Sequence, residues 1–144
     1  MILQFDVGNT RLKWRLLRNK EVVGRGSAAL DEFDIGALCT VDKGVSANTT
    51  IKKGTKIDNQ VQVGHDTIIG ENCLIAAQVG IAGCCILEDN VILWGQVGTN
   101  SGVTIGKGAV LLGQSGASKS LKGGKTYFGT PAAEARKKMQ EIAT

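Results

Sequence analysis

The stretch from Thr55 to Gly83, "TKIDNQVQVGHDTIIGENCLIAAQVGIAG", repeats itself every six residues. A large aliphatic residue recurs at each sixth position, with one threonine exception, and a small residue or valine recurs four positions after it. The aliphatic series is Ile51, Ile57, Val63, Ile69, Ile75, Ile81, Leu87, Leu93, Thr99, Ile105 and Leu111. The small series is Thr55, Val61, Thr67, Cys73, Val79, Cys85, Val91, Val97, Val103, Ala109 and Ser115. Neither an α-helix nor a plain alternating strand has a period of six residues.

This period is typical of an all-β fold, the parallel β-helix of hexapeptide repeats, in which each hexapeptide forms one short strand and one turn. Three hexapeptides make one triangular coil, and both series are expected to point into the prism. The aliphatic step continues upstream to Ile35 and Val41, with Cys39 and Val45 four residues after each. From Val41 to Ile51 the step is ten residues instead of twelve, which predicts one shortened corner. The predicted β-helix covers residues 35–128 in four to five coils, and its flat apolar faces favour a homotrimer.

The composition narrows the class of protein. The chain has 144 residues, 42% of them hydrophobic and 4% aromatic, with 20 glycines and one proline. This predicts one domain with a core of small aliphatic side chains and many tight turns. The net charge of +4 is too small and scattered to indicate nucleic-acid binding, but it suits an acidic protein partner. No apolar run approaches the roughly 20 residues of a membrane helix, and no secretory signal is visible, so a cytoplasmic location is expected.

Four cysteines bear on metal and redox chemistry. Cys73 and Cys85 fall in the small series and are expected in the core. Cys84 and Cys85 are adjacent and lack histidine neighbours in the sequence, so no metal site is predicted. We expect free thiols in a reducing compartment.

His65 is the one histidine of the chain, and the repeat does not require it. Residues one coil apart stack, so His65, Gly83 and Ser101 are expected to form a column. An unpaired imidazole is costly inside so narrow a prism, which places His65 outside, near a cleft between subunits. There the imidazole would accept a proton, and Gly83, with no side chain to block a substrate, would offer its N–H to an oxyanion. The other interpretation is a surface histidine without catalytic role. Asp66 is expected to point to the opposite side of the strand and not to orient His65.

Three segments resemble the C-terminal part of UDP-3-O-(3-hydroxyacyl)glucosamine N-acyltransferase, an enzyme of lipid A biosynthesis in Gram-negative bacteria. They are "IGALCTVDKG", "KIDNQVQVGHDTIIGENCLIAAQVGIAG" and "KTYFGTPAAEARKKMQEIA". The resemblance covers residues 35–144 and includes the corner around "DKG". It implies a left-handed β-helix, a homotrimer, and transfer of a 3-hydroxyacyl chain from acyl carrier protein to the 2-amino group of UDP-3-O-acylglucosamine. The donor is carried on the phosphopantetheine of the carrier protein, so no separate cofactor is implied.

The resemblance also implies roles for single residues. His65 matches the general base, and Gly83 matches the glycine whose N–H serves the thioester carbonyl. Asn59 matches a position near the acyl or pantetheine site. Ser101 stands in place of a second histidine that contacts substrate in many family members. Trp94 replaces a smaller residue, and it either shortens the acyl groove or packs at a subunit contact.

Residues 1–34 lie outside this resemblance. Alternating patterns at residues 2–7, in "RLKWRLL" and in "EVVGRG" predict three strands, with turns at Gly8–Asn9 and Arg18–Asn19. They are expected to form a short β meander that caps the first coil. The opening, residues 1–27, resembles the start of a type III pantothenate kinase, whose first phosphate loop matches Asp6, Gly8, Asn9 and Thr10. The other kinase motifs have no room in the chain, so kinase activity is not expected.

Residues 129–144 are predicted to form a C-terminal α-helix. Thr130 is a suitable N-cap and Pro131 suits the first helical position. Ala135, Met139 and Ile142 follow at helical spacing, which favours a short amphipathic helix packed across the last coil or against a neighbouring subunit.

Three functions remain open at this point. The first is the N-acyltransferase of the lipid A pathway, with a UDP-sugar lipid precursor as acceptor. The second is a coenzyme A-dependent hexapeptide acetyltransferase, which shares the fold and the histidine base. The third is a catalytically impaired trimeric β-helix scaffold, because the family's uridine-nucleotide-binding domain is not in this sequence.

Overall fold

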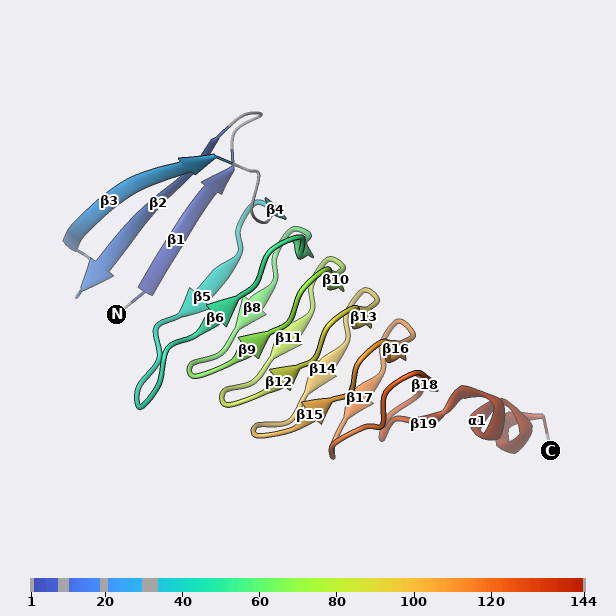
Figure 1. The fold of residues 1–144 in the computed structure, drawn as a ribbon. Helices are drawn as coiled ribbons and strands as arrows, with labels where there is room; N and C mark the ends of the chain where they lie inside the picture. The colour runs from blue at the N-terminus through green and yellow to red at the C-terminus, as the bar shows by residue number, and fades with distance from the viewer. Residues whose placement is uncertain (1, 8–10, 19–20, 30–33, 144) are drawn as a thin grey trace.

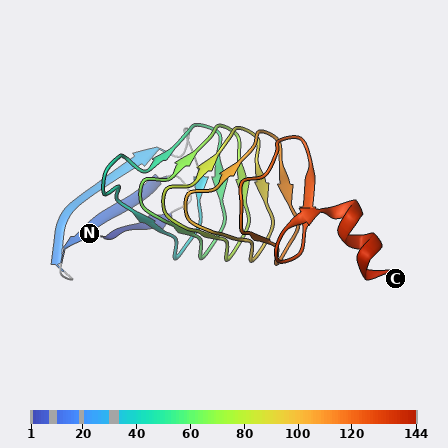
Figure 2. The ribbon, with the colours of Figure 1, turned by 90° about the horizontal axis from the view of Figure 1, so that it is seen from below.

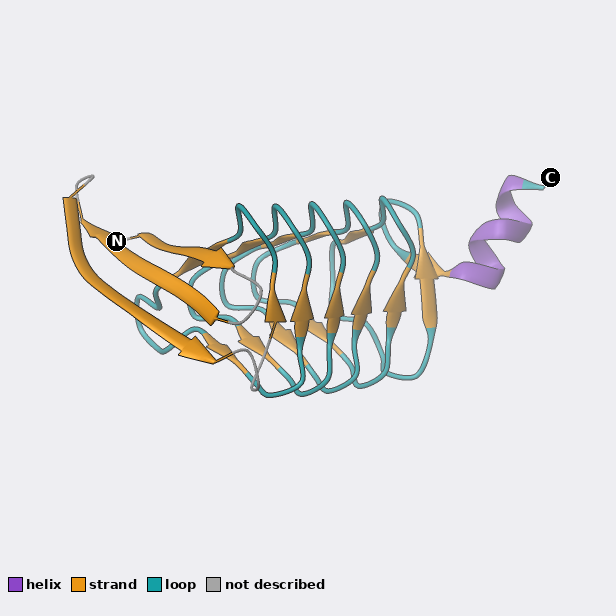
Figure 3. Cartoon of the chain, turned by 90° about the horizontal axis from the view of Figure 1, so that it is seen from above, coloured by secondary structure: helices purple, strands orange, loops and turns teal. Residues whose placement is uncertain are grey.

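The structure, a computed structural model, describes residues 2–7, 11–18, 21–29 and 34–143, with side chains from residue 34 on. Short strands wind into a parallel β-helix with a strand meander at one end and a helix at the other (Figure 1). The three flat faces of the prism are three separate sheets. Figure 3 shows the successive coils side by side along the prism. The predicted fold class is confirmed, with a β cap before the coils and a helix after them.

Each face stacks strands from successive coils. The β8 face holds β5 (Thr40–Asp42), β8 (Gln62–Val63), β11 (Gly80–Ile81), β14 (Gly98–Thr99) and β17 (Gly116–Ala117). The β7 face holds β4 (Asp34–Ile35), β7 (Lys56–Ile57), β10 (Leu74–Ile75), β13 (Ile92–Leu93), β16 (Val110–Leu111), β18 (Thr126–Phe128) and β19 (Ala133–Glu134). The β9 face holds β6 (Thr50–Ile51), β9 (Ile68–Ile69), β12 (Ile86–Leu87) and β15 (Thr104–Ile105). Parallel pairs such as Ile75 with Leu93 join residues one coil apart.

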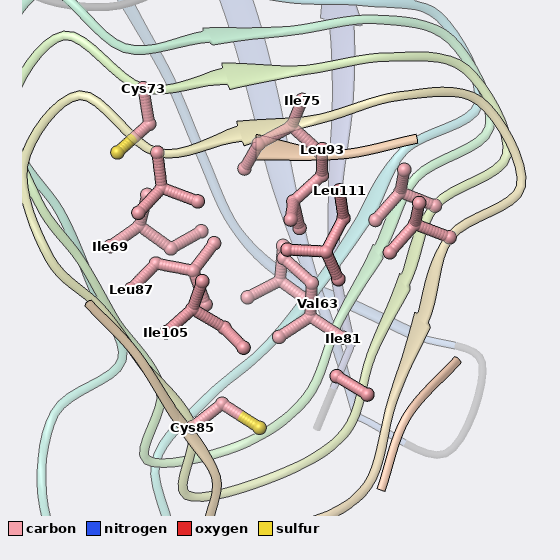
Figure 4. Close-up of a cluster of buried hydrophobic side chains, with 14 of the residues drawn as sticks. Val63, Ile69, Cys73, Ile75, Ile81, Cys85, Leu87, Leu93, Ile105 and Leu111 are labelled. Carbon is pink, nitrogen blue, oxygen red and sulfur yellow. The ribbon is translucent and has the colours of Figure 1, made fainter. Parts of the chain in front are cut away.

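The core is a stack of aliphatic side chains along the prism axis (Figure 4). In most of the two-residue strands of the coils the second residue points inward, so Ile69, Leu87 and Ile105 are fully buried while Ile68 and Ile86 stay partly exposed. Every member of the small series is also buried, as predicted. Cys73 and Cys85 belong to this core, and burial raises the pKa of the Cys73 thiol. The six-residue period therefore encodes the inside of the prism.

One corner differs from the prediction. β5 and β6 are consecutive strands, so Val41 and Ile51 are separated by one hexapeptide step that contains four extra residues. Thr40 pairs with Gln62 across this coil, whereas Gln62 pairs with Gly80 in the regular coil that follows. The predicted shortened corner is wrong because the interval was counted as two short hexapeptides instead of one long one. Residues 43–49 form an enlarged corner, and Val45, placed in the core by the repeat, is 82% exposed there.

The N-terminal segment forms the three predicted strands, β1 (Ile2–Val7), β2 (Arg11–Arg18) and β3 (Glu21–Ala29). They run antiparallel, and β1 pairs antiparallel with β5, so the meander covers the edge of the β8 face (Figure 2). Such pairing satisfies the backbone groups that an edge strand leaves open. The predicted turns at Gly8–Asn9 and Arg18–Asn19 fall wholly or partly on residues 8–10 and 19–20, outside the described residues. The likeness of the opening to pantothenate kinases stays a prediction.

The C-terminal helix starts later than predicted. α1 spans Ala135–Ile142 with Glu134 as its N-cap, and the Thr130–Pro131 peptide bond is cis. The predicted start at Pro131 is wrong because residues 133–134 pair antiparallel with β18 and continue as a strand. The helix projects from the last coil and exposes Met139 and Ile142, so it does not pack across that coil (Figures 1 and 3). None of the described helical residues form a segment long and apolar enough to cross a membrane.

Candidate functional site

His65 lies at the corner where the chain leaves β8, and Gly83 lies at the same corner one coil later. The two are in contact, because a Cβ built on Gly83 would lie 2.6 Å from His65 Nε2 and 2.8 Å from Cε1. Ser101 continues the column, since its hydroxyl donates to the Gly83 carbonyl oxygen at 2.7 Å. The predicted column is present. The sequence had suggested that the missing side chain of Gly83 leaves room for a substrate. In the structure, the imidazole ring of His65 fills that space.

Asp66 orients His65, contrary to the expectation from strand alternation. His65 Nδ1 lies 3.0 Å from Asp66 Oδ2. Asp66 has a φ of 57°, in the left-handed region, so the chain turns there and two neighbouring side chains lie on the same side. Alternation holds only in extended backbone, which ends at Val63. The sequence-based argument therefore failed at a turn residue.

The enlarged corner holds the Asp66 carboxylate in place. The backbone N–H of Ala47 donates to Asp66 Oδ1 at 2.6 Å, and that of Ser46 donates to the same oxygen at 3.0 Å. Gly44 allows this tight fold, because a Cβ on it would lie 1.4 Å from the Ala47 carbonyl oxygen. The Asp66 side chain is only 7% exposed. The hydrogen bond from His65, followed by that from Ala47, lowers the pKa of Asp66 to about 2.

These contacts fix the protonation pattern of the imidazole. With so low a pKa, the Asp66 carboxylate is ionised at neutral pH and can only accept a hydrogen bond. In the neutral ring, Nδ1 therefore carries the proton and donates it to Asp66 Oδ2, which leaves the lone pair on Nε2. The His65 side chain is 45% exposed. The ring is thus oriented by Asp66, and its proton acceptor Nε2 lies beside Gly83.

The Gly83 N–H is the other polar group of this corner. Among the described residues it has no hydrogen-bond acceptor. A Cβ built on Gly64 would lie 2.5 Å from the Gly83 nitrogen, so any side chain at residue 64 would cover that amide. Gly70 approaches the Asp89 nitrogen in the same way, so glycine at residue 64 serves the close approach of successive coils. An amide without an acceptor, as at Gly83, can bind an oxyanion.

Asn59 and Trp94 lie elsewhere, in a groove of about 470 Å³ on the β7 face. Leu74, Ile92 and the half-exposed Trp94 contribute to its lining, together with Lys56. Asn59 lines one side, and its Oδ1 accepts the Ala37 N–H at 2.7 Å. The β8 face separates this groove from His65 within one chain. The structure therefore brings His65, Gly83 and Ser101 together, and Asn59 and Trp94 together, but keeps the two groups apart.

Sequence reasoning missed two members of the first group, Asp66 and Cys84. The Cys84 thiol is exposed, and ligand atoms of His65, Asp66 and Cys84 all lie within 4.8 Å of one another. The coil repeat contained the signal, because Asp66 and Cys84 are one full coil apart and must stack. The cysteine prediction considered neighbours along the chain, whereas this neighbour lies in the coil before. We call the set His65, Asp66, Gly83, Cys84 and Ser101 the histidine corner.

The fold and this corner define a class of protein, a left-handed parallel β-helix of hexapeptide repeats with a histidine–aspartate pair on one edge. Comparison with known proteins agrees. Residues 48–83 match the family model described as bacterial transferase hexapeptide (six repeats). Two solved structures share the fold. UDP-N-acetylglucosamine acyltransferase has a TM-score of 0.69 at 26% identity, over 77% of this chain and 45% of that chain. The enzyme of the same name from Francisella novicida has a TM-score of 0.68 at 20% identity, over 76% and 43%.

The proteins similar in sequence point to one enzyme. They are named UDP-3-O-acylglucosamine N-acyltransferase, which confirms the resemblance found in the sequence. The protein of Campylobacter lari is 52% identical over 58 residues, which are 40% of this chain and 18% of the relative. That of Fusobacterium nucleatum is 62% identical over 45 residues, which are 31% and 14%. The matched stretch thus spans less than a fifth of each of these relatives.

Proposed function

We propose that the chain is an N-acyltransferase of the lipid A pathway type, with His65 as general base. The acyl donor is a 3-hydroxyacyl thioester of acyl carrier protein, and the acceptor is the 2-amino group of a UDP-3-O-acylglucosamine. The observation that carries the proposal is the hydrogen bond between His65 Nδ1 and Asp66, which leaves Nε2 free to take a proton. The names of the sequence relatives support the substrate class.

The proposed reaction uses both polar groups of the histidine corner. The acceptor nitrogen attacks the thioester carbonyl, and His65 Nε2 takes the proton that the nitrogen loses. The carbonyl oxygen becomes negatively charged and accepts a hydrogen bond from the Gly83 N–H. The tetrahedral intermediate then collapses to the amide, and the carrier thiolate leaves with the proton from the His65 imidazolium. Asp66 stabilises the imidazolium between these steps and keeps Nδ1 protonated. No resident cofactor takes part.

Binding of the acyl chain is assigned to the groove on the β7 face. Its apolar lining of Leu74, Ile92 and Trp94 suits a hydrocarbon chain, and Asn59 stands at its polar side. Trp94 would then limit the length of the chain that fits. Because the β8 face separates this groove from His65 in one chain, a groove would serve a histidine corner only across a subunit boundary. This favours the homotrimer, with the base and the groove of one site on adjacent subunits.

The carrier protein is assigned to the basic surface beside the groove. Lys52 and Lys53 are exposed, and Lys56 is exposed and lines the groove itself. Acidic partners are drawn to such a surface by electrostatic attraction. A cytoplasmic location, as the sequence suggests, would give the chain access to carrier-bound acyl groups and stays a prediction.

The test compares acyl transfer by the parent chain and by His65→Ala, with UDP-3-O-acylglucosamine and 3-hydroxyacyl carrier protein as substrates. Product is measured by mass spectrometry. Loss of the base should lower the rate by about 100-fold or more. Asn90→Gly is the matched control, because Asn90 is an exposed corner residue with a φ of 59°, in a column where Gly54 and Gly108 already occur.

Other outcomes decide among the remaining functions. Turnover with acetyl-coenzyme A alone would favour the acetyltransferase. No turnover by the parent chain with any donor, together with an intact assembly in sedimentation, would favour the scaffold. A sedimentation mass of one chain would contradict the homotrimer and the shared site.

A further inference from the structure

We propose that His65, Asp66 and Cys84 form a binding site for a thiophilic divalent cation such as Zn²⁺, and that the bound ion blocks His65 as a base. The first half stands on the geometry of the histidine corner alone. The second half rests on the proposed function.

The coil repeat places Cys84 next to the histidine–aspartate pair. Asp66 and Cys84 occupy the same corner in successive coils, with φ of 57° and 61°. The Cys84 N–H donates to the His65 carbonyl oxygen at 2.7 Å, which fixes the spacing of the two coils at this point. As a result one ligand atom of each of the three side chains lies within 4.8 Å of the other two.

The donor set is the one that zinc prefers. Thiolate sulfur, imidazole nitrogen and carboxylate oxygen are its protein ligands, usually in tetrahedral geometry. With ordinary zinc–ligand distances, two ligands of a tetrahedral ion are separated by about 3.3–3.6 Å. His65 Nδ1 and Asp66 Oδ2, 3.0 Å apart, are already close to this spacing. The Cys84 side chain is exposed and can rotate to complete the set.

The carboxylate is prepared to act as a ligand. Asp66 is 7% exposed and held by two backbone N–H groups of the enlarged corner, so it loses little freedom when an ion binds. The other three cysteines, at residues 39, 73 and 85, are buried in the core. Cys84 is therefore the thiol that an ion from solvent can reach. Three protein ligands leave one position of the ion open to water.

A bound ion is incompatible with proton transfer by His65. If the ion binds Nε2, it occupies the lone pair that would accept the proton. If it binds Nδ1, the ring proton moves from Nδ1 to Nε2, which then has no lone pair to accept another proton. In both cases the imidazole no longer acts as a base, so the ion inhibits the proposed reaction. Release of the ion restores it.

Cobalt(II) is the probe for the test, because a bound thiolate gives it a charge-transfer band in the near ultraviolet. The full chain is titrated with CoCl₂ under nitrogen, and ZnCl₂ is then added in competition. We expect a band with one cobalt per chain that Zn²⁺ removes. Cys84→Ser should abolish it, and His65→Gln and Asp66→Asn should each weaken cobalt binding by more than about 10-fold, the lower bound for loss of an outer-shell partner.

Ser101→Ala is the matched control, because Ser101 lies in the same corner but offers no ligand to the cluster. Its band should equal that of the parent chain. A band that persists in Cys84→Ser would overturn the site, since the thiolate would then come from another cysteine. Circular dichroism of each variant verifies that the β-helix is intact.

The inhibitory half is tested separately in the acyl-transfer assay. Zn²⁺ at a concentration that removes the cobalt band should stop transfer by the parent chain but not by Cys84→Ser. Unchanged transfer by the parent chain would overturn inhibition and leave the metal site standing. A cobalt band that depends on Cys84, in a chain without transfer activity, would refute the proposed function and not the site.

Discussion

Two corners of the prism have the same left-handed backbone conformation but carry side chains with different roles. At one corner Gln60, Gln78, Gln96 and Gln114 repeat in successive coils, all with φ between 60° and 63°. At the histidine corner, Asp66 and Cys84 have the same conformation, but each coil carries a different residue. We call the first the glutamine corner. The repeated glutamines join successive coils to one another, whereas the histidine corner places different side chains one above another.

The glutamine corner stabilises the stack of coils. The side-chain amide of each glutamine donates to the side-chain oxygen of the one in the coil before, at 2.9 Å, 2.8 Å and 3.0 Å along the series. A left-handed conformation costs a residue with a side chain roughly 1–2 kcal/mol. The ladder of amide hydrogen bonds offsets part of this cost. The ladder begins at Gln60, because the first coil has Leu38 at this position, with a φ of 59°.

The histidine corner has no such ladder of identical side chains. Its hydrogen bonds join His65 to Asp66, and Asp66 to the backbone of the enlarged corner. The glutamine corner therefore contributes to stability and the histidine corner to the proposed reaction. Substitutions at the first should change the free energy of unfolding, and substitutions at the second should change the rate of acyl transfer.

Gly83→Ala should have the largest effect on the proposed reaction. Its Cβ would lie 2.6–2.9 Å from three atoms of the His65 ring, so the ring must move. Displacement of the base by about 1 Å can lower acyl transfer by about 100-fold. Gly98→Ala is the control, because nothing lies within 4 Å of a Cβ there. Melting temperatures should be alike for both variants, and equal transfer rates would contradict the assigned place of the base.

Asp66→Asn should have the next largest effect. The amide keeps the shape of the carboxylate but no longer holds Nδ1 protonated or stabilises an imidazolium, so transfer should fall by at least about 10-fold. The measurement is the transfer rate at saturating and at low acceptor concentration. An effect on KM alone would argue that Asp66 contacts the acceptor and does not position His65.

Gln78→Ala should change stability and leave catalysis alone. It removes the two amide hydrogen bonds that join Gln78 to Gln60 and Gln96. We expect a loss of about 1 kcal/mol in the free energy of unfolding, measured in urea. Gln78→Gly should lose less, because glycine adopts the left-handed conformation without strain. A drop in acyl transfer would contradict the structural role of this corner.

The last prediction concerns acid stability. The pKa of Asp66 falls from 3.8 to about 2 on folding, so its ionised form stabilises the native state above pH 4. This contribution is lost as the pH falls from about 4 to 2. The stability difference between the parent chain and Asp66→Asn should therefore shrink over that interval. The difference between the parent chain and Gln78→Ala should stay constant, since no glutamine titrates.

Much of the fold was readable from the sequence. A period of six with two inward series predicted the β-helix, and the buried positions follow both series, because a narrow prism admits only aliphatic or small side chains. The same period predicted the column of His65, Gly83 and Ser101. The three N-terminal strands were predicted from alternation, which holds wherever backbone is extended.

The tertiary structure alone decided the features where the repeat is interrupted. Strand pairing, and not spacing, revealed that the corner at residues 43–49 contains four extra residues and that residues 133–134 delay the helix. The left-handed φ of Asp66 brought its carboxylate to His65, and with it to Cys84, whose place above Asp66 the coil repeat already contained. A sequence period records what each coil has in common. Contacts between a turn, an insertion and a neighbouring coil depend on backbone direction in space, which the period does not contain.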